Sequence, residues 1–283
     1  MSARRGTYPG LNRKREGRWK GPFFFIQIAD PQFGMFDNDQ SWEKETELFS
    51  RAVGAINRLK PRFVIMGGDM VNQEAGRPAH AAEVEEYQRI ARRIDPAIPL
   101  LCISGNHDVG NRPTPAALAA YRREFGDDRF TFWAGGVCGL ALNSNLYWDP
   151  TGAPGEQARQ EAWLARALQV AREAGAKQIL VFQHHPWFLT KPDDLDDYFT
   201  IPRVRREPAL ALMRRAGVRA VFAGHYHRNA YGRDGDLEMI TTSAIGQPLG
   251  NDPSGFRIVQ VFEDRIEHAY YSLDEVPPVV LLK

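Results

Sequence analysis

Five apolar runs in this chain each end in polar side chains that can bind metals or transfer protons. The runs are FFFIQIA, FVIMGG, PLLCISG, ILVFQ and AVFAG. The residues that follow them are, in the same order, Asp30, Asp69, Asn106-His107-Asp108, His184 and His225-Tyr226-His227. Apolar runs of this length are typical of buried strands. Because the carboxyl ends of strands in α/β sheets form the ligand-binding edge, we expect these polar side chains to lie together.

The segments between these runs have the periodicity of helices. Apolar residues recur at three- and four-residue steps over 48–59 and 84–94, and the segments 157–172 and 203–216 also fit helices. Late in the chain, LEMITTSA, FRIVQVF and RIEHAYYSL are typical of strands that no helix separates. An α/β beginning and an all-β end predict two packed sheets covered by helices.

No linker or low-complexity stretch divides the 283 residues, so we predict a single domain over 21–283. The basic segment 1–20 is interpreted as a flexible, solvated N-terminal tail. It superficially resembles the start of a signal peptide, but the apolar run after it contains Gln27 and leads directly into Asp30.

Charge and cysteine content exclude several classes of function. The net charge is +1, which gives no global field for nucleic acid or a membrane surface, and neither partner is expected. No run approaches the roughly 18 apolar residues that a transmembrane helix needs. The two cysteines, Cys102 and Cys138, indicate neither a disulfide framework nor a thiolate metal site, and we expect a cytoplasmic location.

The histidines are concentrated at the strand ends. Five of the seven occupy three of these ends, namely His107, His184, His185, His225 and His227. A single buried histidine is usually a satisfied core group, but five gathered in this way favour a site for metals or proton transfer.

The ordered set of motifs resembles the calcineurin-like metallophosphoesterase superfamily. The set is Asp30-x-x, Gly68-Asp69, Gly105-Asn106-His107-Asp108, His184 and Gly224-His225-x-His227, and the resemblance spans about 23–273. Stretches such as GNHDVGN, FAGHYHRNA and SAIGQPLG look like the calcineurin-like phosphoesterase domain-containing protein 1 subgroup. Members of that subgroup are regarded as cytosolic protein serine/threonine phosphatases.

The resemblance implies a four-layer α/β/β/α sandwich of two mixed sheets flanked by helices, with two divalent metal ions at the sheet edge. By motif, Asp69 bridges both ions. The other implied ligands are Asn106, His184 and His225 in one site, and Asp30 and His227 in the other. His184 is preferred to His185 because the superfamily ligand is the histidine that ends the strand. Carboxylate, amide and imidazole ligands without a thiolate suit Mn, Fe or Zn.

The resemblance also implies a mechanism, in which a metal-bound hydroxide attacks phosphorus. His107 stands beside the ligand Asn106 without being a ligand, and it would stabilise the pentacoordinate state or protonate the leaving alkoxide. Asp108 has two interpretations: it orients His107, or it caps a turn. We expect Asn106, His107 and Asn72 to contact substrate.

Two positions depart from the common pattern. Most members of the superfamily have a histidine where this chain has Gln32. Three interpretations of Gln32 stay open: its amide oxygen binds a metal, it holds a metal-bound water, or it is only a turn residue. Asn72 stands where the calcineurin branch has an aspartate that orients the catalytic histidine, and it would position His107 by a neutral hydrogen bond.

The expected function is hydrolysis of phosphomonoesters, either small ones or phosphoserine and phosphothreonine in proteins. The alternatives are a phosphodiesterase that uses the same site and a metal-poor interaction scaffold of the same fold. The acidic stretch 193–197 either contacts basic residues around a phosphosite or is a solvated loop. Trp187, Tyr198 and Phe199 either line the cleft or pack in the core.

Overall fold

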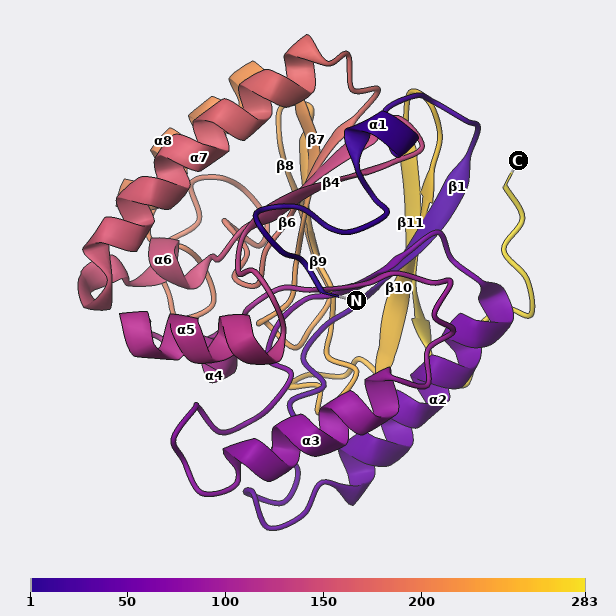
Figure 1. Cartoon of the computed structure of the whole chain (residues 1–283), viewed down its shortest axis with the longest axis vertical. Helices are drawn as coiled ribbons and strands as arrows, with labels where there is room; N and C mark the ends of the chain where they lie inside the picture. Colours follow the sequence, from indigo (N-terminus) through magenta and orange to yellow (C-terminus); the bar gives the residue numbers. More distant parts are fainter. Residues whose placement is uncertain (1, 283) are drawn as a thin grey trace.

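The computed structural model describes residues 2–282 and contains two mixed β-sheets packed face to face (Figure 1). The first sheet has the order β11-β10-β1-β2-β3, and the second has the order β4-β5-β6-β7-β9-β8. The strands of the first sheet are β1 (Phe23–Ile28), β2 (Val64–Met66), β3 (Leu100–Cys102), β10 (Gly255–Val261) and β11 (Ile266–Ser272). Within it, β1, β2 and β3 run parallel, whereas β10 and β11 pair antiparallel.

The second sheet has a parallel centre and antiparallel edges. Its strands are β4 (Phe130–Ala134), β5 (Val137–Ala141), β6 (Ile179–Phe182), β7 (Val218–Ala223), β8 (Ala230–Asp234) and β9 (Leu237–Thr241). The four strands β5, β6, β7 and β9 are parallel, and β4 and β8 join them antiparallel.

Helices cover the outer face of each sheet. On the side of the first sheet lie α2 (Glu43–Leu59), α3 (His80–Ala91) and α5 (Pro115–Glu124). On the side of the second sheet lie α7 (Pro154–Glu173) and α8 (Arg203–Ala216). The short elements are α1 (Arg13–Glu16), α4 (Asn106–Val109), α6 (Asn145–Trp148) and the 3₁₀ turn η1 (Pro150–Gly152).

The hydrophobic core consists of three layers of contacts, as four layers of structure require. In the first layer, Ile26 of β1 packs with Phe49 of α2 and Tyr87 of α3. The neighbouring side chain on β1, Phe25, points to the opposite face because side chains alternate along a strand. There it meets Phe182 and Phe222 of the second sheet edge-on, with ring centroids 5.6 and 5.3 Å apart.

The third core layer joins the second sheet to α7 and α8, through residues such as Leu168, Val181 and Met213. These three layers confirm the predicted α/β/β/α sandwich of two mixed sheets. The helices predicted over 48–59, 84–94, 157–172 and 203–216 are also confirmed as α2, α3, α7 and α8, although the last three residues predicted for α3 lie beyond its end.

The N-terminal segment differs from the expected flexible tail. The apolar residues Ala3, Tyr8 and Leu11 are buried. The Leu11 carbonyl accepts a hydrogen bond from the Trp133 amide of β4, so the segment is attached to the second sheet. The prediction of a flexible tail over 1–20 was wrong for the residues that the structure describes. The few apolar residues that pack there are spaced apart among many basic ones, so the sequence did not indicate their burial.

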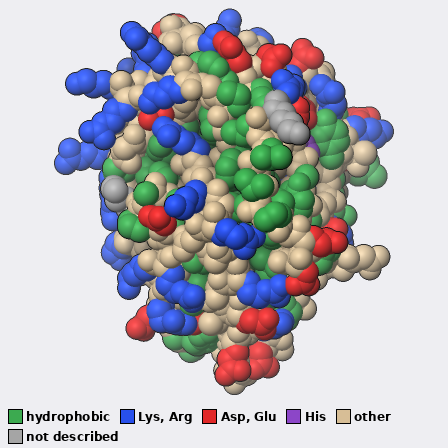
Figure 2. Space-filling model, turned by 90° about the vertical axis from the view of Figure 1, so that its right-hand side faces the viewer, with side chains coloured by type: hydrophobic (Ala, Val, Ile, Leu, Met, Phe, Trp, Pro, Cys, Tyr) green, Lys and Arg blue, Asp and Glu red, His purple; other side chains and the backbone are tan. Residues whose placement is uncertain are grey.

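The end of the chain lies over the outer face of β10 and β11, which Figure 1 shows at the side away from α7 and α8. Val276 and Val280 are partly buried against the first core layer. On this face of the molecule, hydrophobic side chains gather near the terminus and charged side chains of both signs surround them (Figure 2). In the part of the chain that the structure describes, no helix is long and apolar enough to cross a membrane.

Candidate metal centre and active site

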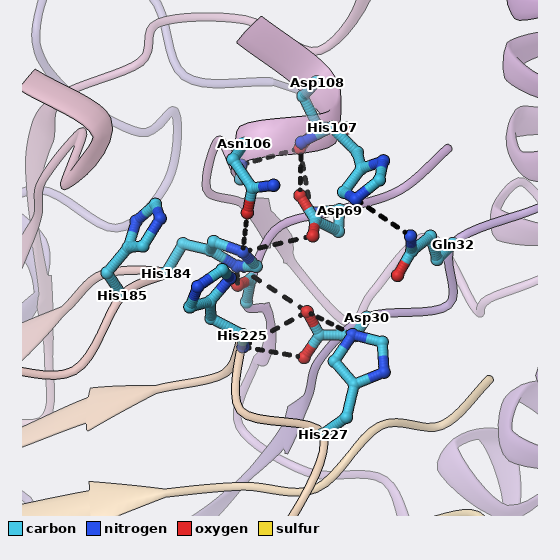
Figure 3. A network of polar contacts seen from close by, with 12 residues as sticks. Asp30, Gln32, Asp69, Asn106, His107, Asp108, His184, His185, His225 and His227 are labelled. Carbon is cyan, nitrogen blue, oxygen red and sulfur yellow. Dashed lines mark hydrogen bonds and ion pairs between the residues drawn. The ribbon is translucent and has the colours of Figure 1, made fainter. Parts of the chain in front are cut away.

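The polar residues that follow β1, β2, β3, β6 and β7 meet at one place, between the carboxyl ends of the two sheets (Figure 3). Asp30 follows β1, Asp69 follows β2, and Asn106 opens α4 after β3. His184 follows β6 and His225 follows β7. The convergence expected from the strand ends is confirmed, and it draws on both sheets.

Two groups of potential metal ligands share Asp69. One consists of Asp69, His184 and His225, and the other of Asp30, Asp69 and His227. Within each group the ligand atoms all lie within 4.8 Å of one another, and every member is buried. A buried cluster of carboxylates and imidazoles with one shared carboxylate is a donor set that suits two neighbouring divalent cations.

Each of the three clustered histidines has one ring nitrogen bound to a backbone carbonyl. The pairs are His184 Nδ1 with Gly67 O at 2.8 Å, His225 Nε2 with Tyr198 O at 3.2 Å, and His227 Nδ1 with Gln247 O at 2.7 Å. A carbonyl only accepts, so each of these nitrogens carries a proton, and the other nitrogen of each ring is the one that would face a bound cation. Outer contacts of this kind commonly fix the tautomer of metal-ligating histidines.

Asn106 lies next to the first group, at the position where the motif predicts a ligand. Its Oδ1 lies 3.1 Å from His184 Nε2, and the same nitrogen lies 3.2 Å from Asp69 Oδ2. His185 is placed differently: its ring is perpendicular to that of His184, at 89°, and its Nδ1 contacts Ser144 Oγ at 3.0 Å. In Figure 3 the ring of His185 lies away from the carboxylates. The geometry therefore favours His184 as the ligand.

Burial and charge act against each other at these residues. Burial alone would raise the pKa of Asp69 and lower that of His184, but their mutual attraction outweighs it. The pKa of Asp69 is consequently lowered, and that of His184 is raised to about 9. Burial, followed by the charge of His184, lowers the pKa of His225 to about 3. The carboxylates thus create negative potential that a bound cation would neutralise.

Gln32 is buried and makes two polar contacts through its amide nitrogen. Its Nε2 lies 2.8 Å from Asn72 Oδ1 and 3.1 Å from His107 Nε2. Its Oε1 is buried without a hydrogen-bond partner among the described residues, and Figure 3 shows this oxygen on the side of Asp30 and His227. An unpartnered buried oxygen beside a ligand cluster fits a metal contact, direct or through water, better than a simple turn role.

Five residues of the site have a left-handed backbone. They are Asp30, Gln32, Asp69, His225 and His227, with φ between 40° and 66°. This conformation is uncommon for residues other than glycine, and such residues cluster at functional sites because the surrounding structure holds them there. The sequence gives no direct signal for these angles.

Glycines allow the close approach that this arrangement requires. A Cβ atom at Gly105 would lie 2.1 Å from Asp69 Oδ1. At Gly68, where φ is +98°, a Cβ atom would lie 2.5 Å from His184 Nδ1. Only glycine, which has no Cβ atom, fits at these two positions.

His107 and Asp108 have separate surroundings although they are adjacent. Asp108 accepts hydrogen bonds from the backbone N–H groups of Gly105, Asp69 and Met70, which matches the interpretation as a turn cap. The His107 ring instead contacts the Asn72 carbonyl through Nδ1 at 2.7 Å. Asn72 is therefore next to His107, as expected, but the direct contact is through its backbone.

The acidic loop mostly satisfies its own backbone. Asp194 accepts N–H bonds from Leu189 and Thr190, and Asp196 accepts one from Arg203 at the start of α8. The same loop brings Tyr198 to the site, where its carbonyl contacts His225 and its hydroxyl lies 3.4 Å from Asn106 Nδ2.

The three aromatic residues expected near the cleft divide between the two interpretations. The Tyr198 side chain is 47% exposed, whereas Trp187 is fully buried in the third core layer. The ring of Phe199 packs against His225 at 5.9 Å, so it lies at the site with Tyr198.

Sequence reasoning missed two acidic residues next to the site. Asp39 accepts a hydrogen bond from the Asn72 side chain at 2.6 Å. Glu83 of α3 accepts bonds from the backbone N–H groups of Asn72 and Gln73. The turn-like stretch Asp37-Asn38-Asp39 was the only available signal, and it does not show where the loop folds back.

Two mixed sheets in a four-layer sandwich, with carboxylates, an amide and imidazoles gathered at their shared edge, define a metallophosphoesterase. The model of the calcineurin-like phosphoesterase family matches residues 25–229. The chain belongs to this family. Membership of the family and the two ligand groups together indicate that the site binds divalent metal ions.

Relatives that match almost the whole chain carry one name. Serine/threonine-protein phosphatase CPPED1 of Danio rerio is 43% identical, with 98% of this chain and 93% of the relative covered. The Bos taurus protein of that name is 45% identical, and the match covers 97% of this chain and 91% of the relative. The Homo sapiens protein is 43% identical with the same coverage, 97% and 91%.

Solved structures with much lower identity share the fold. A dimetal phosphatase from Danio rerio has a TM-score of 0.67 at 18% identity, with 90% of this chain and 98% of that chain covered. GAP50, described as the anchor in the inner membrane complex of Plasmodium, has a TM-score of 0.63 at 14% identity, with 91% and 87% covered. These likenesses concern the fold alone.

Proposed function

We propose that this protein is a metal-dependent phosphatase that hydrolyses phosphomonoesters, with phosphoserine or phosphothreonine of cytoplasmic proteins as its substrates. The observation that carries the proposal is the sharing of Asp69 between two ligand groups, beside the half-buried ring of His107. The names of the relatives that match the whole chain support the choice of substrate class.

Two divalent ions, Mn, Fe or Zn, fit the donor atoms of the site. Asp69, Asn106, His184 and His225 would hold one ion, and Asp30, Asp69, His227 and the free Oε1 of Gln32 would hold the other. Bound divalent cations would neutralise the charge of the phosphate and lower the pKa of water there.

His107 is suited to proton transfer rather than to metal binding. Its Nδ1 is engaged with the Asn72 carbonyl, so Nε2 is the nitrogen that can take up a proton and return it to a departing alkoxide. The His107 backbone N–H also donates to Asp69 Oδ1 at 2.8 Å, which ties the backbone of His107 to the shared ligand. The half-exposed Tyr198 stands beside Asn106 and would contact the group attached to phosphorus.

Activity assays with two aryl phosphates test the proposal. Metal-stripped protein should hydrolyse 4-nitrophenyl phosphate once Mn²⁺ is added, and it should act much more slowly on bis(4-nitrophenyl) phosphate. A phosphoserine peptide should also lose phosphate. Asp69→Asn is the matched variant, since it changes a single ligand and should abolish the Mn²⁺ response. Faster turnover of the diester would indicate a phosphodiesterase, and no turnover of any substrate would favour a scaffold.

A further inference from the structure

We propose that Asp39 is a positioning residue that sets the direction of two side-chain amides, those of Asn72 and Gln32, and through them connects the metal ligands to His107. The inference rests on the proposed function for the role of His107. Asp39 is outside the ligand groups, in the loop between β1 and α2, and its backbone is left-handed with φ of 65°.

The Asp39 carboxylate receives one amide on each oxygen. Its Oδ1 accepts a hydrogen bond from Asn72 Nδ2 at 2.6 Å, and its Oδ2 accepts one from Gln73 Nε2 at 2.8 Å. Gln73 in turn is fixed because its Oε1 accepts the backbone N–H of Ala79 at 2.8 Å. Asp39 is therefore held on one side, through Gln73, by the residue that precedes α3, and on the other side it directs the Asn72 side chain.

The direction of the next amide follows from this contact. An ionised carboxylate only accepts, so the NH₂ group of Asn72 must face Asp39 and the oxygen of Asn72 must face Gln32. Gln32 donates a hydrogen bond to that oxygen from its own NH₂ group, at 2.8 Å. The second hydrogen of Gln32 Nε2 is then directed to His107 Nε2, 3.1 Å away.

The oxygen of the Gln32 amide lies on the side of the metal ligands. With its nitrogen committed to Asn72 and His107, Gln32 can only present its oxygen on the side of Asp30 and His227, where this oxygen is buried and unpartnered. A half turn of the amide would place the NH₂ group there instead, and an amide nitrogen does not bind a divalent cation. The Asp39 carboxylate, 33 residues before Asn72 in the sequence, thus selects the orientation of the Gln32 amide.

A double-mutant cycle at Asp39 and Asn72 tests this directly. Asp39→Asn leaves only one acceptor oxygen at position 39 for the NH₂ groups of Asn72 and Gln73. Asn72→Asp places two carboxylates opposite each other. In the double variant the contact is restored with reversed polarity: the new amide at 39 donates to the new carboxylate at 72, which still accepts from Gln32. Asp37→Asn is the control, because Asp37 is an exposed carboxylate of the same loop.

Three measurements are made on each variant: Mn²⁺ binding to metal-stripped protein by calorimetry, kcat on 4-nitrophenyl phosphate, and the melting temperature. We expect each single change to weaken Mn²⁺ binding at the site of Asp30, Asp69 and His227 and to lower kcat by about 10- to 100-fold, as changes to residues that position metal ligands do. The double variant should recover most of both losses, with melting temperatures close to that of the wild type.

Additive losses in the double variant, or single variants that behave like Asp37→Asn, would overturn the inference. Losses that simply follow a falling melting temperature would do the same. The proposed function is judged separately. If the wild type hydrolyses no substrate but the double variant still recovers its Mn²⁺ affinity, the phosphatase is rejected and the role of Asp39 is retained.

Discussion

At the scale of single residues, His107 differs from the three clustered histidines in what its ring contacts. Its two nitrogens meet the Asn72 carbonyl and the Gln32 amide, whereas His184 Nε2 lies 3.2 Å from the Asp69 carboxylate. Removing His107 should therefore remove proton transfer and leave the ligand set complete.

We predict that His107→Ala retains nearly all of its bound metal but lowers kcat by roughly 10²- to 10⁴-fold, the usual contribution of a general acid or base. Metal content by atomic emission and turnover on 4-nitrophenyl phosphate check this together. His227→Ala is the contrasting variant, since it should lose metal and turnover in parallel. A His107→Ala protein that is stripped of metal would make His107 a ligand.

Glu83 gives a prediction for the dependence of stability on pH. Burial, and to a smaller extent the charge of the neighbouring Asp39, raise the pKa of Glu83 to about 7. The unfolded chain releases this proton near the ordinary glutamate pKa of about 4.3, while the folded protein still holds it. The contribution of Glu83 to stability therefore falls as the pH rises from about 4.3 to 7 and stays low above that.

Glu83→Gln should remove this fall, because the amide keeps its shape and does not ionise. Urea unfolding at pH 5 and pH 8 should show the variant gaining stability relative to the wild type as the pH increases. Glu85→Gln, an exposed change on the same helix, should show no such gain. An equal difference between Glu83→Gln and the wild type at both pH values would contradict the prediction.

Predictability at this scale depends on how local the signal is. Asp30, Asp69, Asn106, His184 and His225 could be placed because each directly follows an apolar run, so the strand itself delivers the side chain. Asp39 could not be placed, because its contact with Asn72 joins two loops and depends on a left-handed backbone. The contacts of Gln32 could not be predicted from the sequence either, although Gln32 stands out because it replaces the histidine of the family pattern.

At the scale of elements, α8 fixes the loop that carries Tyr198. Arg206 of α8 is fully buried, and its guanidinium donates to the backbone carbonyls of Ile201, Pro192 and Asp194. The helix was predicted from its periodicity with the bounds that it has. The loop before the helix has no periodicity. Its conformation depends on the hydrogen bonds of Arg206, which no local sequence pattern predicts.

We predict that Arg206→Met destabilises the protein by about 3 kcal/mol or more, because it leaves several carbonyls without partners, at about 1–3 kcal/mol each where they are buried. Urea unfolding measures the loss. Arg203→Met serves as the control: Arg203 is on the same helix, its side chain is 46% exposed, and its ion pair with Glu207 should contribute less than about 1 kcal/mol. Equal effects of the two substitutions would refute the structural role of Arg206.

At the scale of the whole molecule, the site exists only where the two sheets are packed together. Asp30 and Asp69 come from the first sheet, while His184, His225 and His227 come from the second, so neither sheet holds a complete ligand group. The aromatic layer around Phe25, Phe182 and Phe222 sets the distance between them. The fold class could be predicted from the order of strands and helices, but the packing of the N-terminal segment could not, because its apolar anchors are few.

The central claim is that two divalent ions share Asp69 at this junction of the sheets. Anomalous diffraction from crystals grown with Mn²⁺ tests it most directly. We predict two anomalous peaks flanking the Asp69 carboxylate, one beside His184 and His225 and the other beside Asp30, His227 and the amide oxygen of Gln32. No peak, or a single peak away from Asp69, would contradict the claim.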